Sequence, residues 1–163
     1  MAQYTGKVWV LGDDIDTDII IPTEYLALKT IEDMKQYGFS PLRPELAGQI
    51  QPGDIIVAGK NFGCGSSREQ APEVIKALGI PCIIAKSFAR IFYRNALNNG
   101  LLLLEQQELH DVVKEGDTIT VTVNEDVDYN GKKYPIASLP ENLMEIIEAG
   151  GLVKAMRRRN GLD

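Results

Sequence analysis

Three short apolar segments, separated by stretches with helical spacing, constrain the fold of this chain most. They are Ile55–Ala58, Cys82–Ala85 and the four consecutive leucines at residues 101–104. Continuous apolar runs of this length are typical of strands that are covered on both faces of a sheet. The stretches between them, residues 73–78 and 88–98, place apolar residues on one side of a helix, and a glycine follows each one closely. The alternation predicts a central βαβαβ-like unit.

The regions on either side of this unit predict further strands and helices. Residues 7–11 and 118–123 are rich in apolar and β-branched side chains, as strands are. Asn130-Gly131 fits a type I′ hairpin turn between residues 127–129 and 132–136. We expect helices at residues 32–37, 140–149 and 152–158. The chain has no internal repeat or linker, so we predict a mixed α/β fold and a single domain of residues 1–163.

The size and charge of the chain exclude several classes of protein. A chain of 163 residues, 44% of them hydrophobic, is long enough for one domain with a real core. A formal net charge of −6 argues against a general nucleic-acid binder, which has a basic surface. We find no signal-peptide pattern and no apolar run near the roughly 20 residues of a membrane helix. We therefore expect a cytoplasmic protein that contacts neither membranes nor nucleic acids.

The cysteines and the single histidine make a metal site in this chain unexpected. Cys64 and Cys82 predict reduced thiols rather than a disulfide framework, and together with His110 they lack the spacing of metal ligands. We expect His110 at the surface and Cys82 in the core. Cys64 precedes a predicted helix, whose N-terminus would lower the pKa of the thiol, but we expect a passive role for it.

The most unusual stretch, residues 61–69, follows a predicted strand and precedes a predicted helix. Two glycines allow a tight turn, the helix start offers unpaired N–H groups, and Arg68 offers a two-pronged donor for a carboxylate. These features predict an anion site. An ordinary capped helix is the alternative, because Ser66 and Glu69 fit a capping box. Pro72 prefers the first helical position, which would leave both Ser66 and Ser67 in the loop.

Other well-known motifs do not fit this stretch. The P-loop lacks its Gly-Lys-Ser/Thr end, and a Rossmann fingerprint would need glycine where Arg68 stands. A Gly-x-Ser-x-Gly hydrolase elbow is also absent.

The same loop belongs to a larger pattern that resembles a known family. Its parts, in chain order, are Asp16-Thr17-Asp18, Gly63-Cys64-Gly65-Ser66-Ser67-Arg68-Glu69, Ala85-Lys86-Ser87-Phe88-Ala89-Arg90-Ile91-Phe92 and Asn95. Together they resemble the signature of the swivel domain of the aconitase family. Residues 140–152 resemble the tail of the small subunits, so the resemblance covers nearly the whole chain. The short length resembles two-subunit isopropylmalate isomerases and homoaconitases rather than single-chain aconitases.

The resemblance implies a fold, a reaction and a partner. The fold would be a swivelling β/β/α domain of the aconitase C-terminal type, with a mixed, barrel-like sheet and flanking helices. The reaction would be that of a hydro-lyase, which removes water from a hydroxy acid and adds it back at the neighbouring carbon. The chain would act only with a large iron–sulfur subunit, in a heterodimer or heterotetramer. That partner would carry the [4Fe-4S] cluster, and this chain would carry no cofactor or metal.

The resemblance also assigns roles to residues. Ser66 would be the catalytic base, acting as an alkoxide, while Ser67 and Arg68 would bind a substrate carboxylate. Thr17 and Asp18 match substrate-site positions of the family, and Asp18 would orient the base or an arginine. A solvated Asx turn is the alternative for residues 16–18.

In the small subunits of this family, the segment after residues 16–18 sets specificity. Here the segment consists of Tyr25, Leu26, Ala27 and Leu28. By the resemblance, Ala27 stands where homoaconitases have an arginine that holds a distal carboxylate. Leu26, Ala27 and Leu28 suit a branched aliphatic group such as isopropyl. The expected reaction is the isomerisation of 2-isopropylmalate and 3-isopropylmalate through isopropylmaleate in leucine biosynthesis. Citramalate or dimethylmalate is the next alternative and homoaconitate the third, since Lys29 would suit an acidic substrate.

Two other classes of function remain open from the sequence. The loop and Arg68 fit a non-catalytic anion-binding or regulatory subunit, and a purely structural subunit would use Ser66 only as a cap. The arginines at residues 157–159 suit a solvated helix end.

Overall fold

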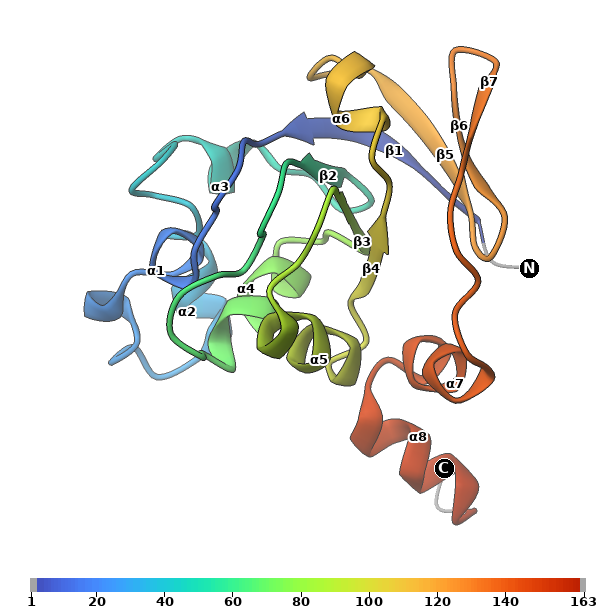
Figure 1. Cartoon of the computed structure of the whole chain (residues 1–163). Coiled ribbons are helices and arrows are strands. Elements are labelled where there is room, and N and C mark those ends of the chain that lie inside the picture. Colours follow the sequence, from blue (N-terminus) through green and yellow to red (C-terminus); the bar gives the residue numbers. More distant parts are fainter. Residues whose placement is uncertain (1–2, 162–163) are drawn as a thin grey trace.

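A seven-stranded mixed sheet runs through the computed structural model, which describes residues 3–161 (Figure 1). The strands are β1 (Gln3–Val10), β2 (Ile55–Ala58), β3 (Cys82–Ala85), β4 (Leu102–Glu105), β5 (Thr118–Thr122), β6 (Asp126–Tyr129) and β7 (Lys132–Pro135). They lie in the order β4-β3-β2-β1-β5-β6-β7. Each strand overlaps a segment predicted from the sequence, although β1 begins four residues earlier than residue 7 and ends at Val10.

The long first strand joins two halves of different character. Residues 3–7 of β1 pair antiparallel with β5, and residues 8–10 pair parallel with β2. β2, β3 and β4 continue in parallel, whereas β5, β6 and β7 form an antiparallel meander. A central βαβαβ unit is therefore confirmed.

Alternate residues of the parallel strands enter two different apolar clusters. Ile56 and Ile83 belong to a cluster that also contains residues of the helices between the strands, whereas Ile55 and Ile84 belong to a cluster shared with β5 and β6. Because successive side chains of a strand point to opposite faces, both faces of these strands are covered. This is why the sequence shows continuous apolar runs there.

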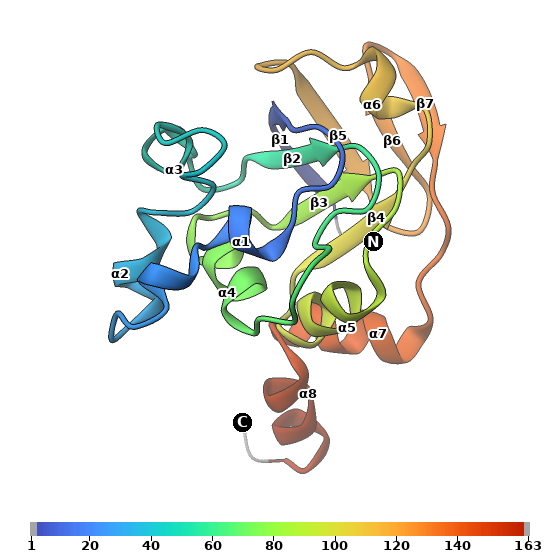
Figure 2. The same cartoon turned by 60° about the vertical axis from the view of Figure 1, so that its left-hand side comes forward.

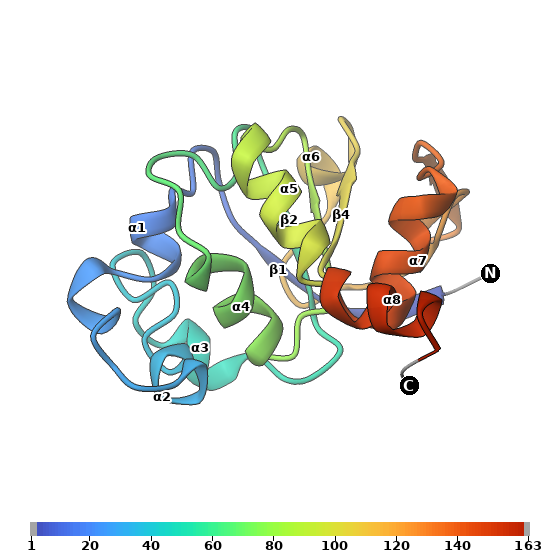
Figure 3. The same cartoon turned by 90° about the horizontal axis from the view of Figure 1, so that it is seen from below.

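The two longer helices of the parallel half are α4 (Gln70–Ala77) and α5 (Arg90–Asn98). The remaining helices are α1 (Thr17–Ile20), the 3-10 turn η1 (Thr23–Tyr25), α2 (Ile31–Lys35), α3 (Leu46–Gln49), α6 (Leu109–Val112), α7 (Glu141–Ala149) and α8 (Leu152–Arg159). The short helices α1 to α3 gather on one side of α4, and α7 and α8 lie on the other side (Figure 3). The sequence did not predict α1, η1, α3 or α6, because helices of three or four residues are too short to show a period.

His110 lies in α6 and is half-buried rather than a surface residue. Its Nε2 lies 2.7 Å from the backbone carbonyl oxygen of Leu11. The side chain thus ties α6 to the end of β1, a contact that its polar sequence neighbours do not reveal.

The C-terminal helix α8 projects from the body of the molecule (Figure 2). Gly150, in the left-handed region with φ of 89°, ends α7 and lets the chain turn into α8. The arginines at residues 157–159 are exposed in its last turn, as the sequence predicted. Among the helices of residues 3–161, none combines the length and the apolar character that crossing a membrane requires.

Candidate active site on the loop between β2 and α4

Three loops meet where the parallel strands end. They follow β1, β2 and β3, and we call the second one, residues 59–69, the serine loop. The carboxyl ends of parallel strands are the usual place for a ligand in an open α/β sheet. The serine loop is joined to the first loop by a 2.7 Å bond from the N–H of Gly63 to the carbonyl of Ile15, and to the third by a bond from the N–H of Ala89 to the carbonyl of Phe62.

The turn of the serine loop depends on glycine. Gly63 and Gly65 have φ of 85° and 88°, a region that residues with a side chain rarely adopt. A Cβ at Gly63 would also lie 2.2 Å from Cγ of the buried Phe92. The backbone here therefore approaches α5 as closely as only glycine allows.

Neither serine caps the helix that follows. α4 begins at Gln70, and its N-cap residue, Glu69, accepts no hydrogen bond through its side chain. Ser66 and Ser67 both precede the helix and are exposed. The capping alternative for Ser66 is therefore wrong, and its hydroxyl is free to meet a ligand.

Thr17, at the start of α1, binds the backbone of the serine loop. Its hydroxyl donates a 2.7 Å hydrogen bond to the carbonyl oxygen of Ser66, and its N–H donates to the carbonyl of Cys64 at 2.9 Å. Thr17 is only 3% exposed, and Asp16 caps α1 by accepting from the N–H of Ile19 at 2.8 Å. Residues 16–18 are therefore not simply a solvated turn.

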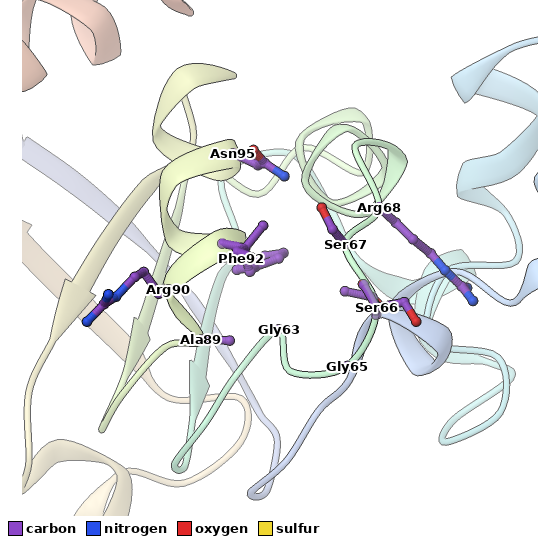
Figure 4. Close-up of a pocket in the computed structure, with 11 residues that line it drawn as sticks. Gly63, Gly65, Ser66, Ser67, Arg68, Ala89, Arg90, Phe92 and Asn95 are labelled. Atoms are coloured by element: carbon purple, nitrogen blue, oxygen red, sulfur yellow. The ribbon is translucent and has the colours of Figure 1, made fainter.

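Arg68 extends from the serine loop toward α1 (Figure 4). Its Nη1 donates to the carbonyl oxygen of Ile21 at 2.7 Å and to Oδ1 of Asp18 at 3.1 Å, and its Nη2 donates to the hydroxyl of Thr23 at 2.8 Å. The hydrogen bond from Arg68 is the main reason why the pKa of Asp18 lies below its usual value. Asp18 therefore stays ionised beside the arginine.

The serine loop and the start of α5 enclose a pocket of about 220 Å³. The serine loop contributes Gly63, Gly65, Ser66, Ser67 and Arg68, α1 contributes Thr17, and the start of α5 contributes Ala89, Arg90, Ile91, Phe92 and Asn95. No carboxylate or imidazole is among these lining residues, which all lie in the described part of the chain. Hydroxyl groups are therefore the groups of this pocket that can exchange a proton with a bound acid.

Five of these residues had no assigned role from the sequence: Ala89, Arg90, Ile91, Phe92 and Asn95. Arg90 and Ile91 are exposed, and Asn95 is half-buried one turn further along α5. In Figure 4 the side chain of Ser67 points toward Asn95, whereas that of Arg90 points away from the pocket. The signal was present, because all five lie in the segments that carry the family resemblance.

The segment expected to set specificity lies outside the lining of this pocket. Tyr25, Leu26 and Leu28 are partly buried and pack against the core, and Ala27 is exposed. The ring of Tyr25 stacks on Tyr37 with centroids 3.9 Å apart. The segment is connected to the site through Thr23 in η1, which binds Arg68.

Neither cysteine has the properties of a reactive thiolate or a cluster ligand. Burial raises the pKa of Cys64, and the nearby carboxylates of Asp16 and Asp14 raise it further, so the expected lowering by a helix terminus does not occur. Cys82 is fully buried in β3, and burial raises its pKa too. In residues 3–161 there is no cluster of three or more His, Cys, Asp or Glu side chains that would hold a metal ion.

Comparisons with known proteins show which family this chain resembles. Residues 23–109 match the aconitase C-terminal domain family. The 3-isopropylmalate dehydratase small subunit of Lachnospira eligens is 79% identical over 161 residues, which cover 99% of this chain and 98% of the relative. The isopropylmalate/citramalate isomerase small subunit of Methanocaldococcus jannaschii is 46% identical, over 94% of each chain.

A solved structure shares the fold. The crystal structure of 3-isopropylmalate dehydratase from Methanocaldococcus jannaschii superposes with a TM-score of 0.92 at 38% identity and covers 99% of this chain and 97% of that one. The predicted fold, a mixed sheet in a half-barrel with flanking helices, is confirmed. This chain belongs to the aconitase C-terminal domain family and, within it, to the small subunits of 3-isopropylmalate dehydratase.

Proposed function

We propose that this chain, paired with a large subunit, isomerises 2-isopropylmalate and 3-isopropylmalate through isopropylmaleate, a step of leucine biosynthesis. The observation that carries the proposal is the serine loop, where two exposed hydroxyls stand beside an arginine already fixed in place. The names of the relatives supply the reaction. The loop supplies groups that suit it, a proton acceptor and an arginine that can donate hydrogen bonds to a carboxylate.

Ser66 is the proposed catalytic base. To dehydrate the substrate, a proton must leave the carbon next to a carboxylate as the hydroxyl departs from the neighbouring carbon. A serine hydroxyl is too weak an acid to ionise in water, so its alkoxide needs fixed positive charge. The start of α4 is the positive end of the helix dipole and has no side-chain cap, and together with the nearby Arg68 it would supply that charge. When water is added back, Ser66 returns the proton to carbon.

Ser67 and Arg68 are proposed to bind a substrate carboxylate, with Thr17 and Asp18 holding the loop and the arginine in place. Their arrangement supports these roles, because Thr17 binds the backbone of Ser66 and Asp18 binds Arg68. A planar guanidinium can offer two parallel hydrogen bonds to one carboxylate.

The partner is proposed to be a large iron–sulfur subunit, in a heterodimer or heterotetramer. The pocket lies at the surface with Ser66 and Ser67 exposed, and an alkoxide needs a site closed to water. The cysteines of this chain do not fit a [4Fe-4S] cluster, since Cys82 is buried in β3 and the described residues bring no three ligand side chains together. Bound in the partner, the cluster would supply a Lewis acid for the departing hydroxyl.

Two further features of the chain support the expected single domain and the expected cytoplasmic location. One sheet continues through both halves by way of β1, which supports a single swivel domain for residues 1–163. Cys64 and Cys82 are both unpaired, which suits a reducing compartment such as the cytoplasm.

The decisive experiment reconstitutes the chain with a cluster-bearing large subunit and follows the ultraviolet absorbance of the unsaturated acid. Ser66→Ala is expected to lose most turnover yet to co-purify with the large subunit, whereas Ser138→Ala, in the segment between β7 and α7, is expected to behave as wild type. Near-normal turnover of Ser66→Ala would refute the role of Ser66 as base. Anion binding without turnover by the wild-type pair would instead indicate a regulatory subunit.

Citramalate is the second candidate substrate, because the relative from Methanocaldococcus jannaschii is named an isopropylmalate/citramalate isomerase small subunit. Measuring kcat/KM for both acids with the same reconstituted enzyme decides between them. A higher value for citramalate would reverse the proposed order.

A further inference from the structure

The guanidinium of Arg68 is only partly engaged, and the pattern of its contacts leaves one edge open. The group carries five N–H donors, two on each Nη and one on Nε. Both donors of Nη1 have partners, the carbonyl of Ile21 and the carboxylate of Asp18. One donor of Nη2 binds the hydroxyl of Thr23. The N–H of Nε and one N–H of Nη2 remain. Because the Thr23 hydroxyl also binds the Asp18 oxygen that Nη1 contacts, it lies on the Nη1 side of Nη2, which leaves the edge shared by Nη2 and Nε.

Thr23 is the residue that decides how Nη2 is oriented. Its hydroxyl accepts from Arg68 at 2.8 Å and donates to Oδ1 of Asp18 at 3.3 Å, while its backbone N–H lies 3.4 Å from the same oxygen. A hydroxyl can do both at once because it is a donor and an acceptor. Thr23 thus closes a ring of hydrogen bonds with Arg68 and Asp18.

Arg68 is the more shielded partner in these contacts, since it is half-buried whereas Asp18 and Thr23 are exposed. The side chain of Arg68 is 15% exposed, whereas that of Asp18 is 61% exposed. An ion pair between two exposed groups contributes little, because water and salt screen it. A hydrogen bond to the shielded guanidinium contributes more. The ring of hydrogen bonds between Arg68, Thr23 and Asp18 therefore fixes the plane of the guanidinium.

Thr23 also connects Arg68 to the segment after it. It is the first residue of η1, which ends at Tyr25. The ring of Tyr25 stacks on Tyr37, so the turn is anchored to the segment just after α2. A shift of this segment therefore moves the hydroxyl that holds Arg68.

We infer that Thr23 is a positioning residue, whose hydroxyl turns the Arg68 guanidinium so that its Nε–Nη2 edge is the one offered to a substrate carboxylate. The inference rests on the proposed function, because it assumes that Arg68 binds substrate. It adds a residue outside the family motif and specifies which edge of the arginine makes the contact.

The test compares Thr23→Val and Thr23→Ser in the reconstituted enzyme. Valine keeps the shape of threonine but loses the hydroxyl, so KM for 2-isopropylmalate is expected to rise about ten-fold, the effect of losing one hydrogen bond to a charged group, with a smaller change in kcat. Serine keeps the hydroxyl and is expected to restore KM. Thr5→Val is the matched control, because its hydroxyl pairs with Thr120 between β1 and β5. A wild-type KM for Thr23→Val would overturn the inference.

A double-mutant cycle asks whether Thr23 acts through Arg68. In an Arg68→Lys background, which lacks the fork, Thr23→Val is expected to raise KM little further, because the effects of coupled residues do not add. Additive effects would overturn the inference. Thr23→Ala, with less side chain to accommodate, gives the same comparison should the valine variant unfold at a lower temperature.

The experiments distinguish a failure of the positioning role of Thr23 from a failure of the proposed function. Full turnover by Ser66→Ala contradicts the proposed mechanism whatever Thr23 does. Loss of turnover by Ser66→Ala together with a wild-type KM for Thr23→Val contradicts the positioning role alone.

Discussion

The hydroxyl of Thr17 donates a 2.7 Å hydrogen bond to the backbone carbonyl of Ser66, across 49 positions of the sequence. The bond fixes the residue that carries the proposed base, and Thr17 itself is buried. Removing the hydroxyl takes this partner from the carbonyl of the exposed Ser66, at a cost of about 0.5–1.5 kcal/mol. Thr17→Val is expected to lose this much free energy of unfolding and a larger share of turnover.

Urea unfolding of the isolated chain and turnover of the reconstituted enzyme measure the two effects of Thr17→Val. Thr17→Ser keeps the hydroxyl and serves as the control. Equal turnover for Thr17→Val and wild type would show that the serine loop holds its shape without this contact.

Gly63→Ala is expected to disrupt the serine loop. A Cβ there would lie 2.2 Å from the ring of Phe92, and the residue has φ of 85°. Either the loop or the buried ring must move, so we expect a clear fall in the unfolding temperature and loss of turnover. Gly48→Ala, in α3, meets no atom within 4 Å and is the control; it is expected to be neutral or slightly stabilising. A Gly63→Ala chain as stable as wild type would contradict the close approach.

Gln106 fastens β4 to the opposite edge of the sheet. Its buried side chain donates to the carbonyl of Pro135 at 3.1 Å and accepts from the N–H groups of Glu108 and Leu109 at 2.6 and 2.9 Å. Gln106→Leu leaves those backbone groups unpaired, which is expected to lower the free energy of unfolding by about 2 kcal/mol or more. Hydrogen exchange should become faster in β7 and α6, and unchanged protection there would argue against this role.

The pair of Arg43 and Glu115 is expected to make stability depend on acid pH. The hydrogen bonds from Arg43, at 2.6 and 3.0 Å, are the main reason why the pKa of Glu115 lies below its usual value. A carboxyl whose pKa is lower in the folded state stabilises the fold above the unfolded pKa, about 4.3 for glutamate, and this contribution is lost as the pH falls through the folded pKa.

Urea midpoints of the wild type and Glu115→Gln, measured from neutral pH to about pH 3, test the prediction for this pair. The wild type is expected to lose stability relative to the variant only below about pH 4.3. A constant difference over the whole range would show that Glu115 does not contribute through its charge.

Ala27→Arg is expected to shift preference toward a longer diacid such as homoaconitate. Ala27 is exposed, so the larger side chain fits without disturbing the core, and its guanidinium would bind a distal carboxylate. The ratio of kcat/KM for the two substrates is the measurement, with Glu24→Arg as a control that places an arginine nearby. Unchanged ratios would show that the segment does not select the substrate.

Local patterns in the sequence determined much of the fold. The apolar runs at Ile55–Ala58 and Cys82–Ala85 predicted two fully covered strands, and both strands are fully buried. The turn at Asn130 predicted the β6–β7 hairpin. Such signals succeed because they depend on neighbours two to four residues apart, which share a strand face or a helix face whatever the rest of the chain does. The short helices α1, η1, α3 and α6 were not predicted, because three or four residues are too few to show a helical period.

The sequence by itself also determined that Ser66, Ser67 and Arg68 share one loop, because they are adjacent and a proline such as Pro72 is tolerated only in the first turn of a helix. Pro72 is not the first helical residue as expected, however, but the third residue of α4, which begins at Gln70. Only the tertiary structure decided what surrounds the three loop residues: the hold of Thr17 on Ser66, the ring of hydrogen bonds around Arg68, and the pocket wall formed by the start of α5. These contacts join residues more than 20 positions apart. Their partners are set by the register and crossing of the parallel strands, which no local pattern encodes.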